Sequence, residues 1–147
     1  MATLNNCNIP EDRMYWVREH VWVIKNDDGT ITIGMTDAAQ HLAGMIVNAN
    51  PKKPGRKVKK GRSAGTVESG KWVGPIKSPV NGVIVEANEK VKANPSILNE
   101  DPYGEGWFVR IQPDDWEADS GDLLEGEEAM KAYQAFLDEK GIDCASR

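Results

Sequence analysis

Lys71 is the residue of this sequence whose type and setting are best suited to chemistry. It follows Gly70 between two segments that are expected to be strands, so its amine is expected at the tip of a hairpin. An amine that protrudes from a rigid turn without an ion-pair partner can form an amide bond with a carboxylic cofactor. Gly70 permits a tight turn and keeps side-chain bulk away from the amine, and Glu68 and Ser69 offer polar contacts to a modifying enzyme. By composition alone, a lysine in a turn is a solvated charge.

The segment from Gly65 to Lys71 also fits all but the last position of the phosphate-binding loop pattern G-x-x-x-x-G-K-[ST]. The last position is Trp72, which has no hydroxyl to hold magnesium. A helix must follow such a loop so that its N-terminus faces the phosphates, whereas Trp72 to Pro75 is typical of strand and turn. Glu68 would also place a negative charge in the cradle. The sequence therefore argues against nucleotide binding.

Other catalytic patterns are not found. The two histidines, His20 and His41, have no acidic cluster around them that would build a hydrolase or metal site, so structural or partner-facing roles are expected for both. Ser69 lacks the G-x-S-x-G elbow of a serine nucleophile. We therefore expect no catalytic residue, no metal site and no enzyme activity of the chain alone.

Length and composition are those of a single globular domain. The chain has 147 residues, of which 39% are hydrophobic and 28% are charged, and such values are ordinary for a folded domain. No apolar run approaches the length of a membrane span, and residues 1–7 lack the basic and apolar regions of a secretory signal. We therefore expect a cytoplasmic protein without membrane insertion.

The charge is unevenly distributed along the chain. The net charge is −5, yet the segment from Lys52 to Arg62, called the basic segment below, holds seven basic residues and no acid. Glycine and proline interrupt this segment, it has no aromatic residue for base stacking, and the protein as a whole is acidic, so nucleic-acid binding is not expected. A solvated loop is the first interpretation, and a docking site for an acidic protein partner is the second.

The two cysteines, Cys7 and Cys144, lie near opposite ends of the chain. Their spacing is neither that of a disulfide framework nor that of a metal site. Two free thiols are the first interpretation. A disulfide between the termini, or a redox role, stays open as an alternative.

Most of the first two thirds of the chain predicts short strands. The runs Val21–Ile24 and Thr30–Ile33 flank Asn26–Gly29, a turn-rich segment that suits a hairpin. Glycine or proline punctuates nearly every gap between the later runs. Further strands are predicted at Met45–Ala49, Ala64–Ser69, Trp72–Lys77, Val83–Ala87 and Trp107–Ile111.

Two helices are predicted. One short helix interrupts the strands, with Asp37 as its cap, Gln40 returning the capping bond and Ala38–Ala43 as its continuation. The second runs from Gly126 to Lys140, where apolar residues recur at three- and four-residue spacing. Its apolar stripe, expected to cover an end of the sheet, consists of Ala129, Met130, Tyr133, Phe136 and Leu137.

Five blocks of sequence resemble the H protein of the glycine cleavage system in order and spacing. They are Tyr15–Trp22, Gly34–Gly44, Val67–Lys71, Ser78–Gly82 and Asn94–Trp107. The resemblance covers residues 15–113 and extends less distinctly into the C-terminal helix. It implies a mainly β fold, a flattened hybrid barrel-sandwich of the lipoyl/biotinyl type with a short internal helix and a C-terminal helix. The expected parts are an N-terminal extension (1–14), the carrier domain (15–125) and a C-terminal helix and tail packed on it (126–147).

The resemblance implies that Lys71 carries lipoate in amide linkage. Glu68, Ser69, Gly70 and Trp72 are then the flanking residues that a lipoate ligase or lipoyl transferase recognises. Biotin is disfavoured, because the lysine that carries it would have methionine on both sides. The protein would supply reach and shelter while the sulfur chemistry belongs to the cofactor.

Two departures from the family pattern bear on the partner. Residues Trp72–Lys77 replace the small, acidic and tyrosine residues that usually follow the lysine, and the basic segment stands where glycine-cleavage members tend to be acidic. The segment after Gly70 looks more like the H-protein-like lipoate-binding proteins of sulfur-oxidising prokaryotes. The resemblance thus implies shuttling of sulfur intermediates in sulfur (thiosulfate) oxidation, with a heterodisulfide-reductase-like complex and dihydrolipoamide dehydrogenase as partners. The alternative is an H protein that carries the aminomethyl group between the glycine cleavage P and T proteins.

Overall fold

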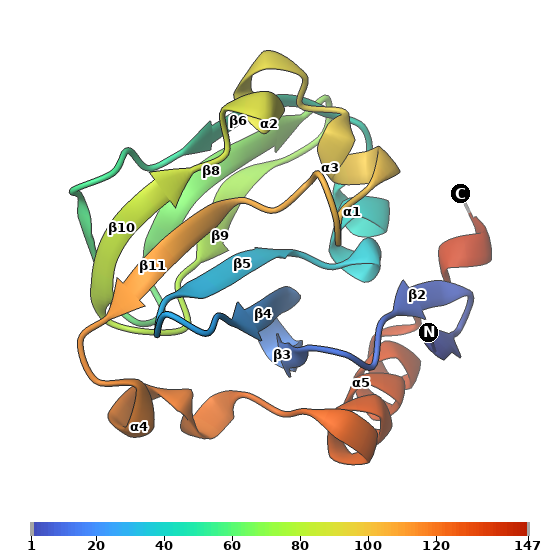
Figure 1. Cartoon of the computed structure of the whole chain (residues 1–147). Helices are drawn as coiled ribbons and strands as arrows, with labels where there is room; N and C mark the ends of the chain where they lie inside the picture. The colour runs from blue at the N-terminus through green and yellow to red at the C-terminus, as the bar shows by residue number, and fades with distance from the viewer. Residues whose placement is uncertain (1, 147) are drawn as a thin grey trace.

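Short β-branched runs between glycine and proline turns form the strands of two antiparallel sheets, which pack face to face with helices at their edges (Figure 1). The computed structural model describes residues 2–146. Met1 and Arg147, which belong to the predicted terminal parts, lie outside the described residues. The mainly β sandwich with a short internal helix and a C-terminal helix agrees with the expected fold class.

The larger sheet contains six strands in the order β3-β4-β5-β11-β10-β7. The predicted hairpin is confirmed, with Val23 of β4 opposite Ile33 of β5. The bounds are β3 (Met14–Trp16), β4 (Val21–Lys25), β5 (Ile31–Met35), β7 (Lys57–Val58), β10 (Gly82–Ala87) and β11 (Val109–Pro113).

The smaller sheet positions Lys71. Its strands, in the order β6-β8-β9, are β6 (Ile46–Pro51), β8 (Ser63–Ser69) and β9 (Val73–Lys77). Ile46 lies opposite Ser69 and Pro51 lies opposite Gly65, so the hairpin after β8 and the loop after β6 occupy opposite ends of this sheet. Gly65 has φ +144°, and a Cβ there would lie 2.5 Å from the Asn50 carbonyl oxygen. Only glycine therefore allows β8 to approach β6 this closely.

The core between the sheets is formed by alternate residues of their facing strands. In β8, Val67 and Ser69 are buried while Thr66 and Glu68 are exposed, as the two-residue period of a strand requires. Ala64 is buried as well, because the pairing register of β8 shifts between Ser63 and Thr66. Ile33 and Ile111 face them from the larger sheet. This packing fixes the base of the hairpin that carries Lys71.

The helix α1 (Asp37–Ala43) has the predicted body but a different cap. Thr36 is the N-cap residue, and its hydroxyl accepts a hydrogen bond from the Ala39 amide (3.2 Å). Asp37 is the first helical residue instead, and its carboxylate accepts from the Gln40 side chain (2.6 Å) and from the Asn8 amide (2.9 Å). The capping prediction was therefore wrong by one residue, because Asp37 is engaged with the N-terminal strands.

The prediction that one short helix interrupts the strands was wrong. Between β10 and β11 the chain also forms α2 (Glu89–Ala93) and α3 (Ile97–Glu100). Val91 and Leu98 are buried and anchor these helices to the core. Each has five residues or fewer, too short for the three- and four-residue periodicity that marks a helix in sequence.

The C-terminal third forms α4 (Trp116–Asp119), α5 (Gly126–Lys140) and short 3-10 turns η2 (Ser120–Asp122) and η3 (Cys144–Ser146). Helix α5 has the predicted bounds. It packs beside the edge strand β3, the 3-10 turn η1 (Val17–Glu19) and the N-terminal strand β1 (Ala2–Leu4) (Figure 1). Tyr133 of α5 is fully buried, and its hydroxyl lies 2.7 Å from both the Thr36 hydroxyl and His20 Nδ1. The apolar stripe of α5 thus forms a second core that also supports the start of α1.

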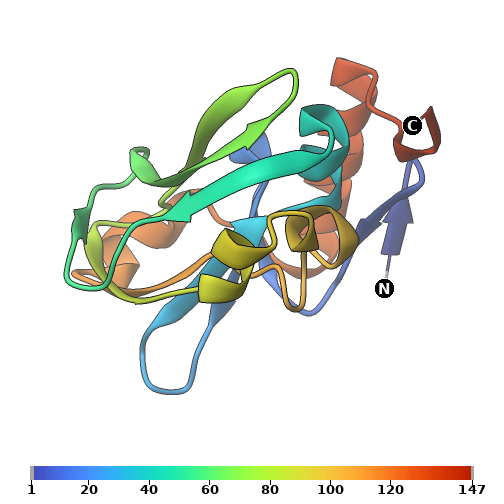
Figure 2. The same ribbon diagram turned by 90° about the horizontal axis from the view of Figure 1, so that it is seen from above.

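The two ends of the chain lie on the same side of the molecule (Figure 2). Strands β1 and β2 (Cys7–Ile9) form a two-stranded sheet, and Cys7 is joined to Cys144 by a disulfide with a Cα–Cα distance of 5.0 Å. Our first interpretation, two free thiols, was therefore wrong. Sequence separation hid the pairing, because the packing of α5 and η3 against β2 brings residues 137 apart into contact. The division at residues 14 and 125 remains a prediction.

Within residues 2–146, no helix is both long and apolar enough to cross a membrane.

Candidate functional site

The turn that joins β8 to β9 consists of Gly70, Lys71 and Trp72, as predicted for the hairpin. Ser69 closes this turn from below: its amide donates to the Trp72 carbonyl (2.8 Å), and its hydroxyl accepts from the Lys71 amide (3.3 Å). Ser69 is only 5% exposed, so its hydroxyl serves the turn. These bonds hold the backbone of Lys71 in place while its side chain extends beyond the sheet.

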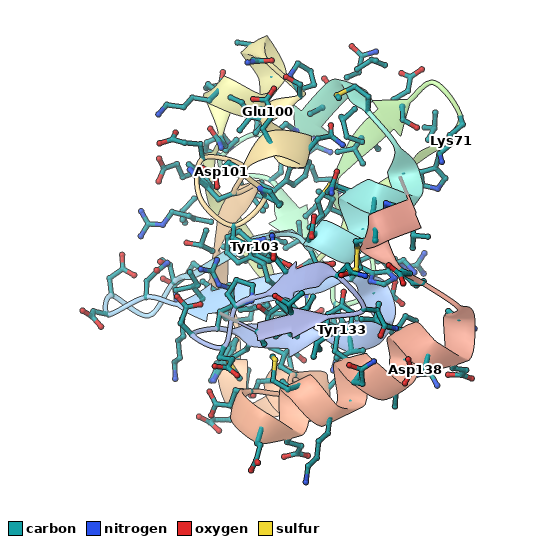
Figure 3. All side chains as sticks on the ribbon, turned by 90° about the vertical axis from the view of Figure 1, so that its right-hand side faces the viewer. Lys71, Glu100, Asp101, Tyr103, Tyr133 and Asp138 are labelled. Atoms are coloured by element: carbon teal, nitrogen blue, oxygen red, sulfur yellow. A yellow bond between two sulfur atoms is a disulfide. The ribbon has the colours of Figure 1, made fainter. Side chains whose placement is uncertain are left out.

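Lys71 stands at the outer end of the hairpin, next to α1 and away from Tyr133 and Asp138 of α5 (Figure 3). It is exposed, and its ammonium makes no ion pair or hydrogen bond with any described residue. The aliphatic part of its side chain lies over Gly44, the residue that ends α1. A Cβ on Gly44 would lie 3.1 Å from Lys71 Cε, and Gly44 has φ +85°. Glycine at this position therefore both ends the helix and leaves room for the lysine.

The other predicted flanking residues differ in what they do. Glu68 is exposed on the outer face of β8, where its carboxylate accepts from the Asn48 side chain (3.1 Å). Gly70 is exposed, has no positive φ, and a Cβ there would meet no atom within 4 Å. The backbone of the turn therefore does not require glycine at position 70, although glycine there keeps side-chain bulk away from Lys71. Recognition of Glu68, Ser69, Gly70 and Trp72 by a ligase remains a prediction.

The indole of Trp72 folds back onto strand β9. A Cβ on Gly74 would lie 2.2 Å from Trp72 Cζ2, so the ring covers the backbone where a side chain would otherwise stand. Trp72 nevertheless remains 40% exposed. Gly74 thus provides the space in which Trp72 lies, and the tryptophan becomes a wall beside the lysine.

Two hollows flank the C-terminal end of α1. The first, called the Trp72 groove, has a volume of about 320 Å³. Its apolar lining includes Val21, Met35, Ala39, Leu42, Ala43, Trp72, Pro75 and Ile76, and its polar lining consists of Arg18, Glu19, His20 and Lys77. The second, called the Lys71 hollow, has a volume of about 640 Å³ and is lined by Gln40, His41, Leu42, Gly44, Met45, Lys71, Asn99 and Glu100.

The ionisable groups of the Trp72 groove have a net positive charge. Glu19 is paired with Lys77 (Oε2 to Nζ, 3.2 Å), and Arg18 forms no salt bridge within the described part of the chain. Burial lowers the pKa of His20 to about 4, so its ring is neutral at pH 7. Arg18 is therefore the one uncompensated charge among these four side chains at neutral pH.

Other features singled out in the sequence lie elsewhere. The basic segment forms an exposed loop with the short strand β7, at the end of the smaller sheet opposite Lys71, and Lys60 is paired with Asp122 (2.8 Å). Residues Gly65 to Lys71, which nearly match the phosphate-loop pattern, lie in strand β8 and the turn after it. Strand β9 follows where a phosphate loop would need a helix. Across residues 2–146 no cluster of three or more His, Cys, Asp or Glu side chains could hold a metal.

Comparisons with known proteins agree with this geometry. The family model for the glycine cleavage H-protein matches residues 14–136. The chain belongs to the glycine cleavage H-protein family. It is 44% identical to glycine cleavage system H protein 5 of Aquifex aeolicus, over 98% of this chain and 99% of that protein. It is 39% identical to the probable glycine cleavage system H protein 2 of Saccharolobus solfataricus, over 98% of both chains.

Solved structures give the same result. The crystal structure of a glycine cleavage system H protein from Mycobacterium marinum superposes with a TM-score of 0.73 and 31% sequence identity, covering 91% of this chain and all of that chain. H-protein family members are non-catalytic components that carry lipoate covalently on a lysine. The chain is therefore a lipoyl carrier and not an enzyme.

The residues present fit such a group. An exposed and unpaired lysine at a hairpin tip gives an amine that a modifying enzyme can reach, and the neighbouring apolar groove has room for a small ring. The sequence analysis did not identify Gly44, Gly74 and Arg18, which shape the surroundings of Lys71. The signal for Gly74 was present in the pattern Trp-x-Gly, because an aromatic side chain can fold over a glycine two residues along a strand.

Proposed function

We propose that Lys71 is the lysine to which lipoate is attached. The observation that carries this proposal is the unpaired ammonium of Lys71 at the tip of the β8–β9 hairpin, beside an apolar groove. When bound there, lipoate supplies a dithiolane that accepts and passes on groups at partner enzymes. Ser69 holds the turn, Gly44 leaves room for the lysine, and Trp72 and α1 form apolar walls beside it.

Intact mass spectrometry of the protein from a host able to make lipoate tests this proposal. The wild type is expected to carry one lipoyl group and Lys71→Arg none. Lys57→Arg is a matched control, because Lys57 is also exposed and lies in the basic segment at the other end of the sheet; this variant should be modified like the wild type. A lipoyl group that persists in Lys71→Arg would assign the attachment to another lysine.

For the multienzyme system, the names of the relatives favour glycine cleavage. Relatives covering nearly the full chain are named as H proteins of that system. In this role the partners are the P, T and L proteins, the carried group is aminomethyl, and a lipoate ligase or lipoyl transferase modifies Lys71. Reconstitution with these proteins tests the role: the lipoylated chain should support glycine-dependent release of carbon dioxide, and Lys71→Arg should not.

A second candidate is the shuttling of sulfur intermediates in heterodisulfide-reductase-like sulfur oxidation. Two observations favour it: Trp72 stands directly after the lysine, and Aquifex aeolicus has several H proteins similar to this chain, numbered 2, 3 and 5, so that copies could serve different systems. The partners would be the heterodisulfide-reductase-like complex and dihydrolipoamide dehydrogenase, in the cytoplasm. Affinity capture with the lipoylated chain from its own cells discriminates the candidates by which enzyme subunits are retained.

A further inference from the structure

The basic segment presents a group of exposed cations that the rest of the described chain does not neutralise. Five of its seven basic side chains are exposed, namely Lys53, Arg56, Lys57, Lys59 and Arg62. None of these five forms an ion pair with a described residue, whereas Lys60 is paired with Asp122. The segment therefore holds like charges close together on the surface of a protein whose net charge is −5.

The backbone of the basic segment is fixed. The Gly55 amide donates a hydrogen bond to the Ile84 carbonyl (2.8 Å), and the Ile84 amide donates to the Arg56 carbonyl (2.9 Å). The Gly61 amide donates to the Ser78 carbonyl (2.8 Å). These bonds attach the segment to strand β10 and to the turn before it. The cations are therefore held together despite their repulsion, and a partner that binds them does not have to order the loop.

Strand β8 separates the basic segment from Lys71. It begins at Ser63, directly after the segment, and ends at Ser69, directly before the turn that contains the lysine. Its seven residues span about 20 Å. A partner bound at the basic segment therefore need not cover the lysine. A carrier held in this way presents Lys71 at a raised local concentration to every active site within reach of the hairpin.

An acidic stretch borders the basic segment. Residues Asp114–Glu128 include eight acidic side chains and no basic one. The ammonium of Lys60 joins the two, because it lies 2.8 Å from the Asp122 carboxylate and 2.8 Å from the Asp119 carbonyl oxygen. A nucleic acid or an anionic membrane extends beyond the cations and would meet these carboxylates within the Debye length of about 8 Å. An acidic patch on a folded protein can be small enough to meet the cations alone.

We propose that the basic segment is a docking surface for an acidic patch on a partner enzyme, and that it keeps the carrier on the assembly while the Lys71 hairpin serves the active sites. Charge complementarity favours this kind of partner, and exposed charges of this kind act mainly by accelerating association and fixing its orientation. The inference rests on the proposed partner enzymes and does not depend on which lysine carries lipoate.

Binding to the purified partner enzymes tests the proposal. The enzymes are the glycine cleavage P, T and L proteins and the heterodisulfide-reductase-like complex, and each Kd is measured by isothermal titration calorimetry at low ionic strength. All chains carry Lys71→Arg, so that on the proposed function no lipoyl group contributes to binding. Lys57→Gln combined with Lys59→Gln is expected to weaken binding to at least one enzyme by about fivefold, because two surface ion pairs are lost.

Lys131→Gln combined with Lys140→Gln is the matched control. It removes the same charge from two exposed positions on α5, and it should change Kd by less than about twofold. Added salt should weaken binding of the parent chain more than binding of the Lys57→Gln, Lys59→Gln variant, because fewer charges remain to be screened in the variant.

The same substitutions in the lipoylated chain separate docking from chemistry. In the reaction of the docked enzyme, KM for the carrier should rise by a factor similar to the change in Kd, and kcat should stay unchanged, because the surroundings of Lys71 are untouched. Mass spectrometry of this chain shows whether Lys71 is lipoylated, so failure of the proposed attachment is distinguished from failure of docking.

Several results would overturn the proposal. One is the absence of measurable binding of the Lys71→Arg chain to any of these enzymes, and another is an unchanged Kd in the Lys57→Gln, Lys59→Gln variant. Equal weakening by the α5 control would assign the effect to net charge alone. Tighter binding to duplex DNA, or to vesicles of phosphatidylcholine and phosphatidylserine, than to the enzymes would assign the segment to a nucleic acid or a membrane instead.

Discussion

Reduction of the Cys7–Cys144 disulfide should destabilise the protein strongly. The two cysteines are 137 residues apart, so the cross-link closes almost the whole chain into one loop. A cross-link that closes a loop of this length lowers the conformational entropy of the unfolded state, which stabilises the folded protein by about 5 kcal/mol at room temperature. For a domain of this size each kcal/mol shifts Tm by about 2–4 °C, so reduction is expected to lower Tm by roughly 10–20 °C.

The non-covalent contacts between the terminal segments are the same in the oxidised and the reduced folded protein, so they do not offset this entropy term. The terminal segments are also joined by the Cys144 amide, which donates to the Asn5 carbonyl (2.9 Å), and by the Asn5 side chain, which donates to Asp138 (3.0 Å). The second of these bonds is exposed and each hydrogen bond contributes about 1 kcal/mol. The N-terminal strands and η3 are therefore expected to separate first in the reduced protein.

Thermal unfolding followed by circular dichroism measures the effect. The Lys71→Arg variant is used, so that on the proposed function no lipoyl disulfide is reduced at the same time. Both sulfurs are buried, so the sample is reduced in denaturant and refolded with a phosphine, and the gain of two hydrogens is verified by mass. A variant with both Cys7→Ala and Cys144→Ala should have a Tm close to that of the reduced protein, and the reductant should not change this Tm. A Tm that changes by less than about 3 °C on verified reduction would refute the loop-entropy argument.

Three further predictions concern the surroundings of Lys71. Gly70→Ala should leave lipoylation intact, because the new Cβ would meet no atom within 4 Å. Its free energy of unfolding, measured by urea titration, should lie within about 0.5 kcal/mol of the wild-type value. Loss of folding in this variant would show that the turn needs glycine. Gly74→Ala should displace the Trp72 indole, since the new Cβ would lie 2.2 Å from it, and should raise quenching of tryptophan emission by acrylamide, an increase that Trp72→Phe removes. The pKa of His20 is lowered to about 4, so the folded state favours the neutral ring. The free energy of unfolding is therefore expected to keep its full value above pH 6.5 and to decrease by about 3 kcal/mol as the pH falls to 4. Urea unfolding of wild type and His20→Asn across this range measures it, and parallel pH profiles would contradict the assignment.

Local patterns predicted most of the secondary structure around the site. The β4–β5 hairpin, strands β6, β8 and β10, the body of α1 and the bounds of α5 follow from β-branched runs, turn residues and helical periodicity. The position of Lys71 between β8 and β9 was predicted for the same reason, because a turn between two strands is specified by residues adjacent in sequence. The family blocks then indicated lipoate, and the comparisons support that cofactor for the family.

Elements held by distant contacts were not predicted. Helices α2 and α3 are too short to show a period, and each is anchored by one buried side chain, Val91 or Leu98. The N-cap of α1 was misassigned because Asp37 is bound by Asn8, which lies 29 residues away. Local propensity carries no information about such partners.

For the site itself, the sequence by itself determined an exposed lysine in a hairpin and the family to which the chain belongs. Only the tertiary structure decided what surrounds that lysine. It placed Gly44 beneath the side chain, folded Trp72 over Gly74, and brought Arg18 and Lys77 to one groove although 58 residues lie between them. The physical reason is that a strand or turn forms from neighbouring residues, whereas a groove and its net charge arise where separate elements pack.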